Sequence, residues 1–255
     1  MGKLDGKTAI ITGASSGFGY AATKLFAQEG CNVVATARRV ERLEQLKAEC
    51  EGLPGKVAIF AGDACEEQTA IDCVQLCMDT FGRIDILINN AGIGYYANLL
   101  DEKATIAQYE KIYDTNVKSA FAFTKYAVAH MKEQHSGQLI FVSSAAGVYG
   151  YPHESFYSSS KFALRGLAQS MDAEFRADGI KSCAYCPGAG ITEFAIGNGR
   201  TVEQMENSGM LTSEQVAEHF LFICSQPASV RIIELRTRAM NEPLTPGDAG
   251  FHTED

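Results

Sequence analysis

The residues best suited to chemistry in this sequence are a tyrosine and a lysine four positions apart, Tyr157 and Lys161 in "FYSSSK". If this segment is helical, both side chains lie on one face of the helix and can approach each other. A free phenol has a pKa of about 10 and exchanges protons poorly at neutral pH. A neighbouring ammonium favours the phenolate and lowers that pKa. The pair is therefore typical of a proton-transfer site, although the same spacing also occurs in ordinary amphipathic helices.

Polar residues that could assist such a pair follow apolar segments elsewhere in the chain. Ser143 and Ser144 come directly after "QLIFV", where a hydroxyl can donate to a substrate oxygen or cap a turn. The segment "NNAG" at 89–92 ends another apolar run and could flank a bound cofactor. Asn116 lies inside an otherwise helical pattern, where asparagine is not favoured, so a role beyond helix formation is indicated.

A glycine-rich stretch, "TGASSGFGY" at 12–20, separates an apolar run from a helical pattern. Without side chains, the backbone can turn tightly and approach a pyrophosphate, whose charge then faces amide groups and a helix N-terminus. A plain glycine-rich turn is the alternative, but the strand before it and the helix after it favour a dinucleotide site. The spacing is G-x-x-x-G-x-G rather than the more usual G-x-G-x-x-G.

The end of the second apolar run, "VVATARR", bears on which dinucleotide is bound. Enzymes that choose NAD usually place an acidic residue there, but this chain has Ala37 followed by Arg38 and Arg39. An arginine can bind a 2′-phosphate with paired donors. The sequence therefore predicts NADP(H), with Arg38 favoured as the phosphate contact over Arg39, and solvated arginines as the alternative. Asp63, just past the third run, is expected near the adenine edge.

The elements that must position these residues are seven apolar runs that alternate with amphipathic stretches. Such alternation predicts βαβ units and a parallel sheet, and continuous apolarity predicts burial on both faces. We expect one domain over residues 1–255, a doubly wound, Rossmann-type α/β fold with a seven-stranded parallel sheet and helices on both faces. The region at about 188–211 is glycine-rich and polar and is expected to form a substrate lid. The predicted strands are 7–11, 32–37, 56–61, 85–89, 138–142, 181–186 and 231–235.

The composition excludes several classes of function. The chain has 255 residues and a formal net charge of −9, and it shows no basic stripe of the kind that nucleic-acid binding requires. No signal peptide and no apolar run of membrane-spanning length is visible, so we expect a cytoplasmic protein without membrane contact. The histidines are scattered, and no metal site is expected. The eight cysteines are expected to be reduced and mostly buried, and the two of "CAYC" at 183–186 should point to opposite faces of a strand.

Taken together, these features carry a family resemblance. T-G-x-x-x-G-x-G at 12–19, N-N-A-G at 89–92, Asn116, Ser144, Y-x-x-x-K at 157–161 and P-G at 187–188 occur in one chain, in this order. In this combination the chain resembles the short-chain dehydrogenase/reductase family over nearly its whole length.

The resemblance implies a role for each candidate catalytic residue. Tyr157 would be the general acid in ketone reduction and the base in alcohol oxidation. Lys161 would lower the pKa of Tyr157 and hold the nicotinamide ribose. Ser144 would orient and polarise the carbonyl, and Asn116 would hold a water that links Lys161 to solvent.

The resemblance also implies two binding sets. Members that prefer NADP often have a basic residue after the second strand, as Arg38 is here, and a subset has one before the second motif glycine, where this chain has Ser16. The expected substrate-binding residues are Ser144, Tyr95, Tyr151, His153 and Tyr157, with Tyr96, Asn98 and the lid nearby. The expected cofactor-binding residues are Gly13, Ser15, Ser16, Gly17, Phe18, Gly19, Arg38, Arg39, Asp63, Asn90, Ala91, Gly92, Tyr157, Lys161, Pro187, Gly188 and Thr192.

The function implied is NADP-dependent hydride transfer between the nicotinamide and a ketone, an aldehyde or a secondary alcohol, with hydroxysteroids and other cyclic alcohols among the candidates. One alternative is a nucleotide-sensing regulator without turnover, and another is a ketoacyl carrier-protein reductase, which a charge of −9 makes less attractive. In the family, helices corresponding to 103–134 and 155–178 pair across subunits, so a homo-oligomer, dimer or tetramer, is expected.

Overall fold

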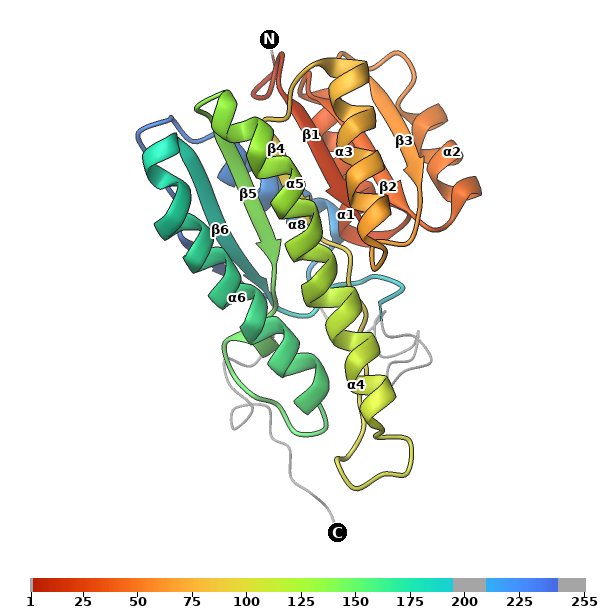
Figure 1. Ribbon diagram of the computed structural model, residues 1–255. Helices are drawn as coiled ribbons and strands as arrows, with labels where there is room; N and C mark the ends of the chain where they lie inside the picture. The colour runs from red at the N-terminus through yellow and green to blue at the C-terminus, as the bar shows by residue number, and fades with distance from the viewer. Residues whose placement is uncertain (1, 195–209, 243–255) are drawn as a thin grey trace.

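The computed structural model describes residues 2–194 and 210–242 and builds them around a seven-stranded sheet (Figure 1). All adjacent strands are parallel, in the order β3-β2-β1-β4-β5-β6-β7. The predicted fold class is therefore confirmed. The strands are β1 Thr8–Thr12, β2 Asn32–Ala37, β3 Val57–Ala61, β4 Ile86–Asn89, β5 Gly137–Val142, β6 Ile180–Pro187 and β7 Glu234–Thr237.

The helices cover both faces of this sheet. The side chains of α1, α2 and α8 pack on one face, and those of α3, α5 and α6 pack on the other. In Figure 1 the second group lies in front of the sheet. The helices are α1 Gly17–Gln28, α2 Val40–Glu49, α3 Glu67–Phe81, α4 Ile106–Tyr113, α5 Ser119–Glu133, α6 Ser155–Phe175 and α8 Ser213–Cys224, with a π-helical turn η1 at Asp114–Lys118 and 3₁₀ turns η2 at Ala145–Gly147 and η3 at Arg176–Asp178.

The local sequence explains where several helices begin and end. Thr212 caps α8 by accepting from the Gln215 amide, and the Gln215 side chain accepts from the Thr212 amide in return. Thr105 caps α4 in the same way through the Gln108 amide. Helix α3 ends at Gly82, whose φ of +73° is left-handed and suits glycine.

The burial of the strands explains why their predicted bounds lie close to those in the structure. Every residue of β1, β4 and β5 is buried, as their continuous apolarity predicts. The last strand is the largest difference, because it begins at Glu234 rather than at the predicted Arg231. Pairing with β6 extends from Ala184 opposite Glu234 to Pro187 opposite Thr237, and just before it the Ala184 amide donates to the Ile233 carbonyl at 3.0 Å.

Six of the eight cysteines are buried, and Cys65 and Cys224 are partly buried. All eight are free, and Cys183 and Cys186 pack in the cores on opposite faces of the sheet, as strand geometry predicts. Among the described residues, no cluster of histidine, cysteine, aspartate or glutamate is arranged to hold a metal ion, and no helix is long and apolar enough to span a membrane.

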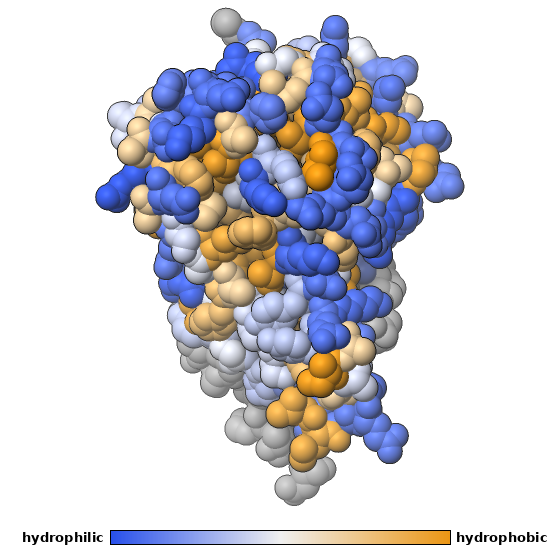
Figure 2. Space-filling model, in the orientation of Figure 1, coloured by the Kyte–Doolittle hydropathy of each residue, from blue (hydrophilic) through white to orange (hydrophobic). Residues whose placement is uncertain are grey.

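The surface is not uniformly polar. Figure 2 shows hydrophobic surface at the tip of the molecule that lies below α4. Leu99 and Leu100, in the loop that precedes α4, are 66% and 91% exposed. This loop extends away from the sheet (Figure 1) and follows the "NNAG" segment at the end of β4.

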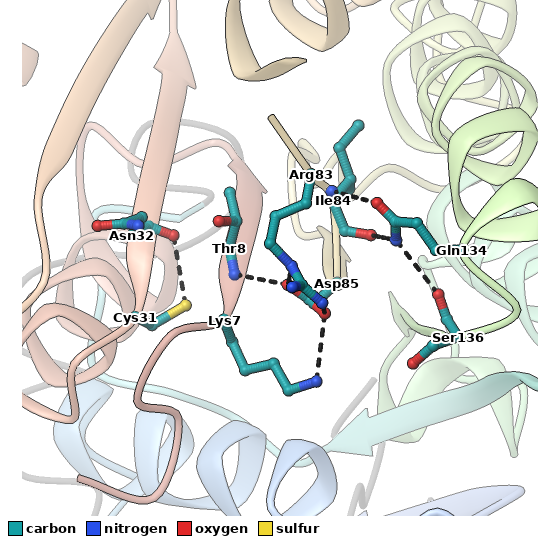
Figure 3. A network of polar contacts seen from close by, with 9 residues as sticks. All are labelled: Lys7, Thr8, Cys31, Asn32, Arg83, Ile84, Asp85, Gln134 and Ser136. Carbon is teal, nitrogen blue, oxygen red and sulfur yellow. Dashed lines mark hydrogen bonds and ion pairs between the residues drawn. The ribbon is translucent and has the colours of Figure 1, made fainter. Parts of the chain in front are cut away.

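A charged network joins the starts of β1 and β4 at the sheet edge opposite the carboxyl ends of the strands (Figure 3). Asp85 is 4% exposed and accepts hydrogen bonds from the Thr8 amide at 2.9 Å, from Lys7 Nζ at 3.2 Å and from two nitrogens of Arg83 at 2.7 Å each. Burial alone would raise the pKa of the Asp85 carboxyl, but Arg83, the Thr8 amide and Lys7 together hold it below its ordinary value.

We expect Asp85→Asn to lower the free energy of unfolding by about 1–3 kcal/mol, because the amide lacks the negative charge and offers one acceptor oxygen in place of two. Asp72→Asn is the matched control, since Asp72 is exposed and accepts a hydrogen bond from Gln68 of its own helix. Because the folded-state pKa of Asp85 lies below the unfolded value of about 3.9, its contribution is complete well above that pH and is lost as the pH falls through the folded-state pKa. In urea unfolding from pH 7 down to pH 3, the free energies of unfolding of the wild type and of Asp85→Asn should converge. A difference that stays constant over this range would contradict the lowered pKa of Asp85.

Candidate active site

A cavity of about 860 Å³ opens at the carboxyl edge of the sheet, where parallel strands bring their ends together. It lies at the point where the order of the strands reverses, between β1 and β4. The predicted residues that line it are Gly13, Ser15, Ser16, Gly17, Phe18, Arg38, Arg39, Asp63, Asn90, Ala91, Gly92, Ser144, Tyr151, Tyr157, Lys161, Pro187, Gly188 and Thr192.

The glycine-rich turn owes its shape to the absence of side chains. Gly13 has a φ of +68°, and a Cβ there would lie 2.9 Å from the Ala91 Cα. Helix α1 begins at Gly17, so its amino end faces the cavity. Gly19, by contrast, does not line the cavity. It is buried in the turn, where a Cβ would lie 2.7 Å from both Asn90 Nδ2 and the Gly13 carbonyl oxygen.

Thr12 joins the glycine-rich turn to the segment that follows β4. Its buried Oγ1 accepts hydrogen bonds from the amides of Asn90 at 3.0 Å and Ala91 at 2.9 Å. Asn90 Nδ2 in turn donates to the Thr12 carbonyl at 2.8 Å. The two strand ends at the reversal point are therefore held together by one threonine and one asparagine.

The tyrosine and lysine of the proton-transfer pair lie together at the start of α6. Tyr157 is 7% exposed and Lys161 is 3% exposed, and Lys161 Nζ lies 5.5 Å from the centre of the Tyr157 ring. Nζ donates to the Val142 carbonyl at the end of β5, 2.8 Å away. Burial lowers the pKa of Lys161 to about 8, since desolvation disfavours the ammonium. Ser143 Oγ donates to the Lys161 carbonyl at 2.7 Å and so fastens α6 to β5.

Ser144 lies at the end of β5 and caps the turn η2. Its Oγ accepts from the Ala146 amide at 3.1 Å, which leaves the hydroxyl hydrogen to donate elsewhere. The far end of the same turn is held by Arg165, which donates to the Gly147 carbonyl at 2.8 Å and pairs with Glu234 of β7. Sequence reasoning missed Arg165, because nothing near it in the sequence marks it as different from other arginines in helices.

Asn116 lies behind the cavity rather than in its wall. It is fully buried in the π-helical turn, a rare form of helix. Its Oδ1 accepts from the Ile93 amide at 2.8 Å, and its Nδ2 donates to the Ile93 carbonyl and to Ser160 Oγ, each at 3.0 Å. Asn116 thus connects the segment after β4 to α6.

The two arginines after β2 differ in their surroundings. Arg39 donates to Ser15 Oγ at 3.1 Å and pairs with Glu193 at 2.8 Å. Arg38 is exposed, and within residues 2–194 and 210–242 its guanidinium has no recorded hydrogen bond or ion pair. Asp63 lines the same end of the cavity, where the Cys65 amide lowers the pKa of its carboxyl.

At the other end of the cavity, only some of the expected substrate-binding residues line the wall. Tyr95 does not line the cavity, because its ring stacks on Phe156 and its hydroxyl donates to the Lys103 carbonyl at 2.9 Å. His153 is exposed with a φ of +62° and does not line the cavity either, whereas the ring of Tyr96 lies 6.2 Å from that of Tyr157.

Several lining residues were not named from the sequence, among them Phe194, which falls inside the predicted lid, and Arg238 and Glu242. The Phe194 ring lies 5.5 Å from the Tyr157 ring, and Arg238 and Glu242 follow β7 in a segment that carries no motif. The predicted lid at about 188–211 is described only at its two ends, where Ile191 and Leu211 are joined by a hydrogen bond of 2.9 Å. Residues 195–209 lie outside the described part of the chain.

Comparison with known proteins decides the family. Residues 7–202 match the family model for short chain dehydrogenases. The chain belongs to the short-chain dehydrogenase/reductase family. Its members are oxidoreductases that bind a nicotinamide dinucleotide. The chain is 34% identical over 232 residues to a 3-oxoacyl-[acyl-carrier-protein] reductase, FabG, of Thermotoga maritima, with 89% of this chain and 94% of that protein covered.

Other relatives of this short-chain dehydrogenase/reductase act on different compounds. A farnesol dehydrogenase of Aedes aegypti is 32% identical over 250 residues, which cover 95% of this chain and 99% of that one. Among solved structures, a serine dehydrogenase complexed with NADP+ aligns with a TM-score of 0.84 at 29% identity, covering 92% of this chain and 96% of the other. An alcohol dehydrogenase from Thermococcus sibiricus, complexed with 5-hydroxy-NADP, aligns at 0.82 with 25% identity, covering 92% and 97%.

We expect Thr12→Val to lower the free energy of unfolding by about 1–3 kcal/mol, because the Asn90 and Ala91 amides lose a buried acceptor while the side-chain shape is kept. Thr12→Ser keeps the oxygen and is the matched control. Denaturant unfolding of the three proteins measures the effect. If the valine variant were as stable as the serine variant, the hydrogen bonds to Thr12 Oγ1 would not be what holds the two strand ends together.

Proposed function

We propose that this chain is an NADP(H)-dependent oxidoreductase that transfers a hydride between the nicotinamide and a ketone, an aldehyde or a secondary alcohol. The observation that carries the proposal is the buried Lys161 ammonium beside the Tyr157 ring, in a cavity that also contains Ser144. An amine is seldom buried unless it is held by polar partners and put to use. When it is bound, the cofactor supplies or accepts the hydride.

The shape of the cavity fits a dinucleotide. The cradle at the start of α1 exists because Gly13 and Gly17 lack side chains, and a Cβ on Gly17 would lie 3.0 Å from the Thr192 side chain. A pyrophosphate there would face backbone amides and the amino end of the helix. Arg38, exposed at the end of β2, is proposed to bind the 2′-phosphate, with Arg39 already held by Ser15 and Glu193. The NADP-bound structures of similar proteins support NADP as the cofactor.

The residues around Tyr157 suit proton transfer to a carbonyl oxygen. We propose that the Tyr157 hydroxyl protonates the ketone oxygen in reduction and accepts the proton in oxidation. Lys161 supplies a positive charge that favours the phenolate, and its hydrogen bond to Val142 fixes where that charge lies. Ser144 Oγ, which already accepts from the Ala146 amide, is proposed to donate its hydrogen to the same carbonyl oxygen.

Asn116 is proposed to hold a water that connects Lys161 to solvent. A Cβ on Gly92 would lie 3.2 Å from Asn116 Oδ1 and 3.4 Å from Lys161 Nζ. The lack of a side chain on Gly92 therefore leaves a space that both polar groups border. The π-helical turn sets Asn116 at this depth, beside the segment that follows β4.

A second candidate function is reduction of a 3-oxoacyl group on an acyl carrier protein, which the similarity to the Thermotoga maritima enzyme favours. It uses the same proton-transfer residues but requires a basic surface for the acidic carrier, and the net charge of this chain is −9. A nucleotide-sensing regulator, the remaining alternative, would bind NADPH without turnover.

A homo-oligomer is also proposed. The large apolar side chains of Phe121 on α5 and Phe162 on α6 are exposed, and a groove lined by both helices lies beside Phe121. Such an apolar face suits a self-complementary contact between two copies of the chain.

Tyr157→Phe is expected to reduce turnover of ketones with NADPH by at least about 100-fold, because the ring is kept and the transferable proton is removed. Nicotinamide fluorescence should show NADPH binding within a few-fold of the wild type. Tyr126→Phe, which alters a surface tyrosine bonded to Glu67, is the matched control. Undiminished turnover in the Tyr157 variant would remove that residue from the mechanism, and NADPH binding without any turnover by the wild type would favour the regulator.

Arg38→Ala is expected to weaken NADPH binding by about tenfold or more while leaving NADH binding unchanged, because only NADPH carries the 2′-phosphate. Arg39→Ala, one position along, is the comparison variant. Titrations of both cofactors against the three proteins give the preference directly. A preference that survives Arg38→Ala but is lost in Arg39→Ala would assign the phosphate to Arg39 instead.

A further inference from the structure

The segment that follows β7 closes the substrate end of the cavity with a pair of opposite charges. Arg238 and Glu242 both line the cavity that contains Tyr157, and each side chain is only 16% exposed. Arg238 Nη1 donates to Glu242 Oε1 at 3.2 Å. Neither residue is needed for the proton transfer proposed above, so their place in the wall needs another explanation.

The Glu242 carboxylate is held as a bound carboxylate would be. The Ala189 amide, just past the end of β6, lies 3.1 Å from each of its two oxygens, and Arg238 supplies the charged donor. A guanidinium with a backbone N–H is a donor set suited to carboxylates. Space for the carboxylate exists because residue 188 is glycine, since a Cβ there would lie 1.9 Å from Glu242 Oε2.

Arg238 is held from several sides. Its Nη2 donates to the Tyr151 hydroxyl at 3.1 Å, and its guanidinium carbon lies 5.9 Å from the centre of the Tyr149 ring. Because the Tyr151 oxygen accepts from Arg238, its own hydrogen is left to donate to another acceptor. Tyr151 lines the same cavity, so it adds a second donor beside the guanidinium.

The two charged residues lie in different backbone settings, because Arg238 directly follows β7 and Glu242 lies in a turn where its amide donates to the Ala239 carbonyl at 3.0 Å. Arg238 follows Thr237, whose carbonyl accepts from the Gly188 amide at 2.7 Å and whose Oγ1 lies 2.9 Å from the buried Tyr185 hydroxyl. Glu242 lies in a turn after the strand, next to Asn241 and Met240, both of which are exposed. A largely buried ion pair is weak evidence for stability, since desolvation offsets the attraction. Arg238 is therefore the member of the pair beside the paired strand, whereas Glu242 lies in an exposed turn that can move without disturbing the sheet.

We propose that Arg238, the Tyr151 hydroxyl and the Ala189 amide form a subsite for a carboxylate group of the substrate, and that Glu242 occupies this subsite when no such substrate is bound. The substrate class is then a keto acid or hydroxy acid, with its carbonyl or hydroxyl carbon at Tyr157 and its carboxylate at Arg238. The inference rests on the proposed function, because it names the substrate of the same cavity.

The test compares keto acids with their uncharged methyl esters as substrates for NADPH-dependent reduction: acetoacetate with methyl acetoacetate, and levulinate with methyl levulinate. Of the two acids, we consider the one with the lower KM. For the wild type we expect this KM to be about tenfold or more below that of the corresponding ester. Arg238→Met should raise KM for that acid by about 10- to 100-fold and change KM for the ester by less than about twofold. Arg238→Lys should lie between, and Arg176→Met, at an exposed arginine beyond the end of α6, should match the wild type.

The Glu242→Gln variant tests whether the Glu242 carboxylate competes with the substrate for the subsite or is a fixed part of the cavity wall. It should lower KM for the acid several-fold, because the competing internal carboxylate is gone, and leave the ester unchanged. A raised KM for the acid in this variant would overturn the exchange. Equal use of acid and ester by the wild type, or equal loss of both in Arg238→Met, would overturn the subsite.

Calorimetric titration of levulinate into the NADP-loaded protein separates failure of the inference from failure of the proposed function. If levulinate binds the wild type but not Arg238→Met, and no ketone is turned over, the carboxylate subsite is supported and the proposed oxidoreductase activity is contradicted. Turnover of the esters with no gain in binding or KM for the acids would keep the oxidoreductase and remove the subsite.

Discussion

The site depends on one buried ammonium group. Lys161 is almost without exposure, and desolvation disfavours its charge enough to lower its pKa to about 8. The group is held by the Val142 carbonyl, and the backbone around it is fastened by Ser143. The space beside it is narrow, because a Cβ on Gly92 would lie 3.2 Å from Asn116 Oδ1 and in contact with Nζ at 3.4 Å. The end of β5, the start of α6 and the segment after β4 therefore have to meet at one point.

The parallel sheet makes that meeting point available. The carboxyl ends of its strands lie along one edge, and the order of the strands reverses between β1 and β4. Thr12 and Asn90 close the gap there with short hydrogen bonds. At the opposite edge, Asp85 joins the starts of the same two strands with charged bonds (Figure 3). The two strands on which the cavity depends are thus held at both ends.

The two ends of the cavity are built by different kinds of segment. The end assigned to the dinucleotide is formed by tight turns after β1, β2 and β4, where glycine and small residues leave backbone exposed. The end assigned to the substrate is formed by longer segments, among them the one that holds Tyr151 and the one that holds Arg238 and Glu242. Relatives named for such different compounds as farnesol and serine fit this division, since side chains on loops change without disturbing the sheet.

The sequence by itself determined the seven parallel strands, the glycine-rich turn and the tyrosine–lysine pair, because strand burial and helical spacing are local properties of the chain. It did not determine which side chains of the longer segments enter the cavity. Tyr96 does and Tyr95 does not, His153 turns outward at a positive φ, and Gly19 packs against Asn90. Arg238 reaches Tyr151 across 87 positions of sequence. Contacts of that separation are decided by how the loops pack on the finished sheet, which only the tertiary structure contains.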